Sequence, residues 1–79
     1  MVTEQQVIEV IAKALKIKNE ELTALSSTAN VESWDSLGHL SILMALDKKF
    51  DGKVAEIEEM AEAESLDKII NLLKSKSLI

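Results

Sequence analysis

The sequence predicts an all-α fold: a small four-helix bundle of three longer helices and one short one, with a long loop after the first helix. The 79-residue chain has no proline and only two glycines, so few residues interrupt a helix. No segment sustains the alternation of apolar and polar residues that a half-buried strand requires. A chain of this length is expected to form a single domain, residues 1–79.

The first helix is predicted from about Thr3 to Ile17. Thr3 and Gln6 have the spacing of a capping box, in which each side chain bonds the backbone of the other residue. Apolar residues recur at helical spacing and predict one buried face: Val7, Ile11, Ala14 and Leu15.

A long loop is predicted from Asn19 to Ser33. Its serine, threonine and asparagine side chains compete with the backbone for hydrogen bonds, which favours turns. Leu22, Leu25 and Val31 recur within it, and we expect them to hold the loop against the core. The pattern is equally compatible with one short helical turn in this segment.

The second helix is predicted from Asp35 or Ser36 to Phe50, where Asp51-Gly52 ends it because glycine readily adopts the left-handed conformation. Its apolar residues, notably Leu37, Leu40 and Met44, cover more than one stripe. One side of this helix is therefore expected to contact the core and the other side something else.

Two more helices complete the predicted bundle. A short acidic helix is expected over Val54–Ala63. Ser65 is expected to cap the last helix, with Asp67 in its first turn. The apolar stripe of that helix is Leu66, Ile69, Ile70 and Leu73.

The composition argues against several classes of function. Fourteen acidic residues oppose nine lysines, with no arginine, and the net charge of −5 disfavours nucleic-acid binding. The absence of cysteine excludes disulfides and a thiol nucleophile, and one histidine cannot form a metal site alone. We expect no enzyme activity, no metal, no membrane span and no secretion signal, and the cytoplasm as the default location.

Ser36 is the strongest candidate for a functional residue. It lies between a polar loop and the start of a helix, so it can be a simple helix cap. The same position also suits a phosphate group, because free backbone N–H groups and the helix dipole stabilise negative charge there. Asp35 can orient the hydroxyl or hold a divalent cation during phosphoryl transfer, and Leu37 offers an apolar contact to a partner.

Asp35-Ser36-Leu37, near the middle of an acidic and helical chain, resembles the acyl carrier protein family. The apolar pattern continues to fit through Leu40, through Met44-Ala45-Leu46 and through Phe50-Asp51. The resemblance covers essentially the whole chain. The tripeptide alone is a weak signal, but its position within this pattern is a specific one.

The resemblance implies a phosphoprotein in which a phosphopantetheinyl transferase, using Mg²⁺, attaches 4'-phosphopantetheine to Ser36. Cofactor-binding residues would be Ser36, Asp35 and Leu37. Cargo would be held as a thioester, the chain itself would have no catalytic residue, and acyl-loading and acyl-transferring enzymes would act on the cargo. Fatty acid biosynthesis and lipid metabolism are the implied setting, and we expect a monomer.

One departure from the family pattern affects the choice of partners. Fatty-acid carriers usually place acids just after the motif, whereas this chain has Gly38 and Ser41 there and lysines further on. Docking on basic partner surfaces is therefore expected to be weakened or redirected. A specialised carrier is more plausible than a housekeeping one, and a peptidyl or aminoacyl carrier and an unmodified helical interaction module remain alternatives.

Six further residues have predicted roles. We expect Trp34 to pack the loop against the second helix and His39 to be exposed, with a contact to the phosphopantetheine arm or to a docking partner as the alternative for His39. Met44 and Leu46 are expected in the core, with a cleft for a cargo chain as the alternative. In that alternative, Val54 and Met60 close the far end of the cleft.

Overall fold

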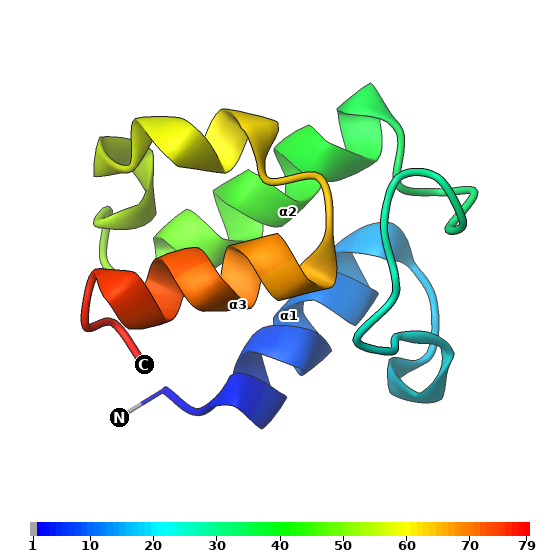
Figure 1. Cartoon of the computed structure of the whole chain (residues 1–79), viewed down its shortest axis with the longest axis horizontal. Helices are drawn as coiled ribbons and strands as arrows, with labels where there is room; N and C mark the ends of the chain where they lie inside the picture. The colour runs from blue at the N-terminus through cyan, green and yellow to red at the C-terminus, as the bar shows by residue number, and fades with distance from the viewer. Residues whose placement is uncertain (1) are drawn as a thin grey trace.

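The computed structural model describes residues 2–79, and within them the fold is all-α, as predicted. Three α-helices, α1, α2 and α3, are joined by segments that include three 3-10 helices, η1, η2 and η3 (Figure 1). Their bounds are α1 Glu4–Leu15, η1 Asn19–Glu21, α2 Ser36–Lys49, η2 Val54–Glu56, η3 Glu58–Glu62 and α3 Leu66–Ser75. No helix in this part of the chain combines the length and apolar character that a membrane span requires.

The predicted caps are present at the two helices that have clear amphipathic patterns. At α1, the Gln6 backbone N–H donates to Thr3 Oγ1 at 3.2 Å and the Thr3 backbone N–H donates to Gln6 Oε1 at 2.9 Å, which is the predicted capping box. At α3, Ser65 Oγ accepts from the Lys68 backbone N–H at 3.2 Å. These local signals defined the helix starts correctly because every partner lies within one turn.

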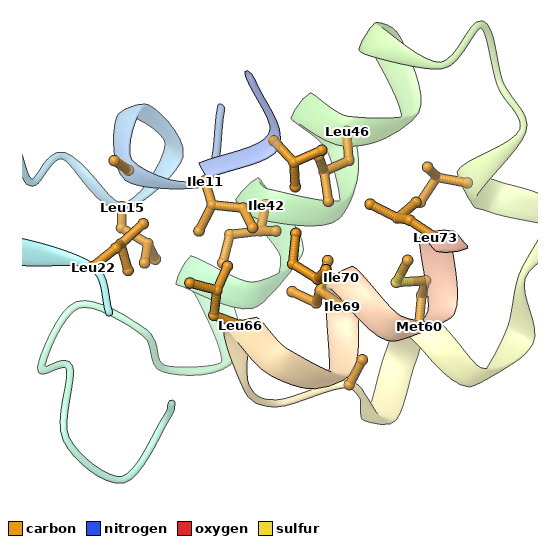
Figure 2. Close-up of a cluster of buried hydrophobic side chains, with 14 of the residues drawn as sticks. Ile11, Leu15, Leu22, Ile42, Leu46, Met60, Leu66, Ile69, Ile70 and Leu73 are labelled. Atoms are coloured by element: carbon orange, nitrogen blue, oxygen red, sulfur yellow. The ribbon is translucent and has the colours of Figure 1, made fainter. Parts of the chain in front are cut away.

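The core is formed where the three α-helices meet, and η3 covers one side of it. Figure 2 shows Ile11 of α1, Ile42 and Leu46 of α2, and the stripe of α3 pointing into one cluster. Met60 reaches the same cluster from η3, beside Leu73. The α3 stripe is buried throughout, as predicted. Leu46 is fully buried and confirms the core assignment made for it.

The predicted short helix over Val54–Ala63 is replaced by two 3-10 helices, so the count of four helices is not confirmed. Four apolar residues in this segment are buried at a constant spacing of three, namely Val54, Ile57, Met60 and Ala63. A 3-10 helix has three residues per turn, so this spacing places all four side chains on one face. In an α-helix the same spacing would drift away from the core.

The long loop contains the short helical turn η1 and is attached to the core differently from the prediction. Leu22 is buried and Val31 packs against the core, but Leu25 is 82% exposed. The prediction for Leu25 is wrong because a turn closed by hydrogen bonds between Thr23 and Ser26 directs it outward. Ser26 is buried instead, and its carbonyl accepts from the Leu66 N–H at 2.9 Å.

Candidate functional site

Ser36 is the first residue of α2, at the end of the molecule where the long loop meets that helix (Figure 1). Its side chain is exposed, as are those of Asp35 and Leu37. The N-cap of the helix is Asp35, whose Oδ1 accepts from the Gly38 backbone N–H at 2.8 Å. The capping hydrogen bond therefore belongs to Asp35, and the simple role of helix cap does not apply to Ser36.

Gly38 allows the loop to cross the start of α2. A Cβ atom at this position would overlap the backbone carbonyl oxygen of Ser33 and would lie 3.1 Å from a methyl group of Leu15. The loop backbone thus occupies the space that a side chain at position 38 would need. This contact gives a structural reason for glycine at position 38.

Trp34 and His39 link the loop, α2 and η3 through buried hydrogen bonds. Trp34 Nε1–H donates to His39 Nδ1 at 3.1 Å, and His39 Nε2 lies 2.8 Å from the carbonyl oxygen of Met60. Trp34 is 1% exposed, which confirms its predicted packing role. The predicted exposure of His39 is wrong, because the residue is only 9% exposed and its ring lies between these two partners.

A surface hollow of about 460 Å³ begins beside Ser36, and we call it the Ser36 hollow. It extends past Trp34 and His39 to Ala61. Its rim carries carboxylates from three places, namely Glu32, Asp35 and Glu64. Among residues 2–79, no group of three or more potential ligand side chains is arranged to hold a metal ion.

A second hollow of about 320 Å³ lies between α2 and the η2–η3 segment, and we call it the apolar cleft. Ala61 lines both hollows, so the apolar cleft adjoins the Ser36 hollow at this residue. Seven apolar residues line the cleft: Leu43, Met44, Val54, Ala55, Ile57, Met60 and Ala61. Three of the residues considered for a cargo cleft, Met44, Val54 and Met60, therefore line the same surface hollow, whereas Leu46 belongs to the core.

The side of α2 that faces away from the core carries exposed apolar residues. Leu37 is 75%, Leu40 is 54% and Met44 is 65% exposed, so the core assignment of Met44 is wrong. These residues have helical spacing, and Lys48 continues the row toward the end of the helix. The buried side of the same helix presents His39, Ile42 and Leu46. An apolar surface therefore begins directly beside Ser36.

Sequence reasoning missed two residues that shape this site. His39 has a detectable signal, because it precedes Ile42 by three and Leu46 by seven residues and so falls on their buried face. Ala61 has no such signal, because its importance comes from lying between two hollows.

No family model matches the chain, and no solved structure matches it either.

Proposed function

We propose that this chain is an acyl carrier, which holds acyl groups as thioesters on a 4'-phosphopantetheine arm attached to Ser36. The observation that carries the proposal is the environment of Ser36. Its hydroxyl is exposed at the first position of α2, while the capping hydrogen bond is made by Asp35. A hydroxyl in this position is accessible to an enzyme and is not required to start the helix.

The attachment reaction requires only a nucleophilic oxygen from the chain. Ser36 Oγ would attack the phosphorus atom that bears the pantetheine of coenzyme A, and adenosine 3',5'-bisphosphate would leave. The hydroxyl proton would pass to a base of the phosphopantetheinyl transferase. The free N–H groups at the start of α2 favour the phosphate that remains. The arm supplies the thiol that a cysteine-free chain lacks.

The apolar cleft supports an aliphatic cargo. A cleft lined by leucine, valine, isoleucine and methionine side chains removes hydrocarbon surface from water, worth about 25 cal/mol for each Å² buried. Ala61 lines both the cleft and the Ser36 hollow, so the cleft lies next to the place where the arm would be attached. Partner enzymes would perform the chemistry on this cargo.

The partners would be a phosphopantetheinyl transferase and the enzymes that load and transfer the acyl group. The exposed row of Leu37, Leu40 and Met44 offers them an apolar contact beside the arm. Because Gly38, Ser41 and Lys48 replace the acids that a fatty-acid carrier usually has on this helix, a specialised acyl pathway fits better than the housekeeping one. An aminoacyl or peptidyl cargo is compatible with the same attachment chemistry.

A second candidate is a helical interaction module that carries no arm. The specific observation in its favour is the same exposed apolar row, because such a surface often marks a protein interface. In this case Ser36 would have no chemical role, and a partner would bind equally well to the Ser36→Ala variant.

Intact mass distinguishes the two candidates. The wild-type protein is incubated with coenzyme A, Mg²⁺ and a broad-specificity phosphopantetheinyl transferase, beside Ser36→Ala and Ser41→Ala. Ser41 is also an exposed serine of α2, so it is a matched control. We expect the wild type and Ser41→Ala to gain the mass of one arm and Ser36→Ala to gain none. A folded wild-type protein that keeps its bare polypeptide mass would remove the basis for the carrier proposal.

A further inference from the structure

The hydrogen bonds of His39 define a single state of its ring. The carbonyl oxygen of Met60 only accepts hydrogen bonds, so Nε2 of His39 must carry a proton to donate to it. The indole Nε1–H of Trp34 only donates, so Nδ1 of His39 must be unprotonated to accept from it. Both bonds form together only in the neutral Nε2–H tautomer.

The bond between His39 and Met60 lies where the two hollows adjoin. His39 lines the Ser36 hollow, Met60 lines the apolar cleft, and Ala61 lines both. The 2.8 Å hydrogen bond therefore joins α2 to η3 at the passage from one hollow to the other. A chain that moves from Ser36 into the cleft by way of Ala61 would pass beside this connection.

The η3 side of the passage is the more movable one. η3 spans only Glu58–Glu62, and short 3-10 helices have poorer hydrogen-bond geometry than α-helices. The residue that precedes η3 makes no side-chain cap, whereas η2 is tied to α2 by the Ala55 N–H, which donates to Asp47 Oδ1 at 2.8 Å. On the α2 side, by contrast, His39 belongs to a 14-residue helix that begins at a capping carboxylate. Opening of the passage would therefore displace η3 from α2.

We propose that His39 is a latch: its hydrogen bond to Met60 holds η3 against α2 and controls whether a chain attached at position 36 enters the apolar cleft. Trp34 positions the ring by holding Nδ1 as an acceptor. The inference rests on the proposed function for the identity of the natural cargo. The latch itself depends only on the two hydrogen bonds and the adjoining hollows.

The first test uses the unmodified protein and measures the tautomer of His39. Long-range proton–nitrogen NMR spectra at neutral pH distinguish Nε2–H, Nδ1–H and charged rings by the shifts of the two nitrogens. We expect the Nε2–H tautomer. A charged ring or the Nδ1–H tautomer would overturn the latch without any substitution, because Met60 would then lose its donor or Trp34 its acceptor.

The second test attaches a chain chemically, so that it needs no transferase. The protein has no cysteine, so Ser36→Cys introduces a unique thiol. Its thiolate attacks the alkyl-bearing sulfur of dodecyl methanethiosulfonate, a disulfide forms, and methanesulfinate leaves with the electron pair of the broken S–S bond. Methyl NMR shifts of Val54, Ile57 and Met60 then report whether the chain is in the cleft.

The labelling is compared in four proteins that all contain Ser36→Cys. One has no other change, and the others add His39→Gln, His39→Phe or Trp34→Phe. Glutamine keeps an N–H that can reach Met60, phenylalanine keeps a ring without a donor, and Trp34→Phe removes the indole N–H while leaving the bond to Met60. We expect labelling to shift the cleft methyl groups several-fold more in His39→Phe than with His39 or His39→Gln. Trp34→Phe should fall between them, because its His39 ring keeps the bond to Met60 but loses the group that positions it. Each labelled protein is compared with its own unlabelled form, which cancels the direct effect of the substitution.

Two outcomes of this comparison would overturn the latch. One is equal cleft shifts in all four proteins, and the other is full entry of the chain while His39 is intact. If His39→Phe does not fold, the tautomer measurement still tests the two hydrogen bonds on which the latch depends. A wild-type protein that accepts no phosphopantetheine would refute the proposed function and leave both tests of the latch intact.

Discussion

Helices α3 and α2 use their apolar residues differently. In α3 the stripe of Leu66, Ile69, Ile70 and Leu73 is buried, and most of the remaining surface is polar. In α2 a buried side coexists with an exposed apolar side that contains Leu37 and Met44. Packing within the molecule accounts for the stripe of α3. It does not account for the exposed side of α2, so that side is available to another molecule beside Ser36.

The largest expected effect of a substitution is on the buried stripe of α3. Leu73→Ala should lower the free energy of unfolding by about 2–5 kcal/mol, because it removes a fully buried side chain and leaves a cavity. Urea denaturation measures this change. A loss below about 1 kcal/mol would mean that the core collapses around the cavity and that the buried stripe of α3 contributes little to stability.

The next effect concerns the crossing of the loop over α2. Gly38→Ala should lower the free energy of unfolding by about 1–3 kcal/mol, because the added methyl group overlaps the Ser33 carbonyl. Replacing a glycine in the middle of a helix with alanine by itself adds about 0.5–1 kcal/mol of stability, and Gly38, in the first turn of α2, would gain less. The sign of the measured change therefore shows which effect is larger. Ser41→Ala, an exposed change in the same helix, is the control, and a stabilised Gly38→Ala protein would refute the close approach.

A smaller effect separates Asp35 from Ser36. Asp35→Ala should lower the free energy of unfolding by about 0.5–2 kcal/mol, because the Gly38 N–H loses its cap. Ser36→Ala should change it by less than about 0.5 kcal/mol, since Ser36 is exposed and does not cap the helix. Thermal unfolding of both variants checks this. A larger loss of stability for Ser36→Ala than for Asp35→Ala would mean that Ser36 caps the helix.

The smallest effect on stability is expected on the exposed side of α2. Leu37→Ala and Met44→Ala should each change the free energy of unfolding by less than about 0.5 kcal/mol. The proposed function adds that the KM for the carrier in phosphopantetheine transfer should rise several-fold for Leu37→Ala. Leu25→Ala, an equally exposed change in the loop, is the control. If all three variants are modified like the wild type, this row of side chains is not the transferase contact.

Much of the fold was predictable because its signals are local. The capping box of Thr3 and Gln6, the cap at Ser65 and the left-handed Gly52 all involve partners a few residues apart. The stripe of α3 was equally clear, because helical spacing alone defines it. The position of Ser36 at the start of α2 follows from the same kind of signal. The spacing of three from Val54 to Ala63 was also present in the sequence, and it indicates a 3-10 helix once the period is counted.

The sequence by itself therefore determined the helical class, the three α-helices, the caps of α1 and α3, and the placement of Ser36 at a helix start. The tertiary structure alone decided that Leu25 and Met44 face outward, that His39 is buried against Met60, and that two hollows meet at Ala61. The physical reason is the range of the interactions. Caps and stripes depend on residues within a turn or two, whereas burial and hollows depend on segments that folding brings together from distant parts of the chain.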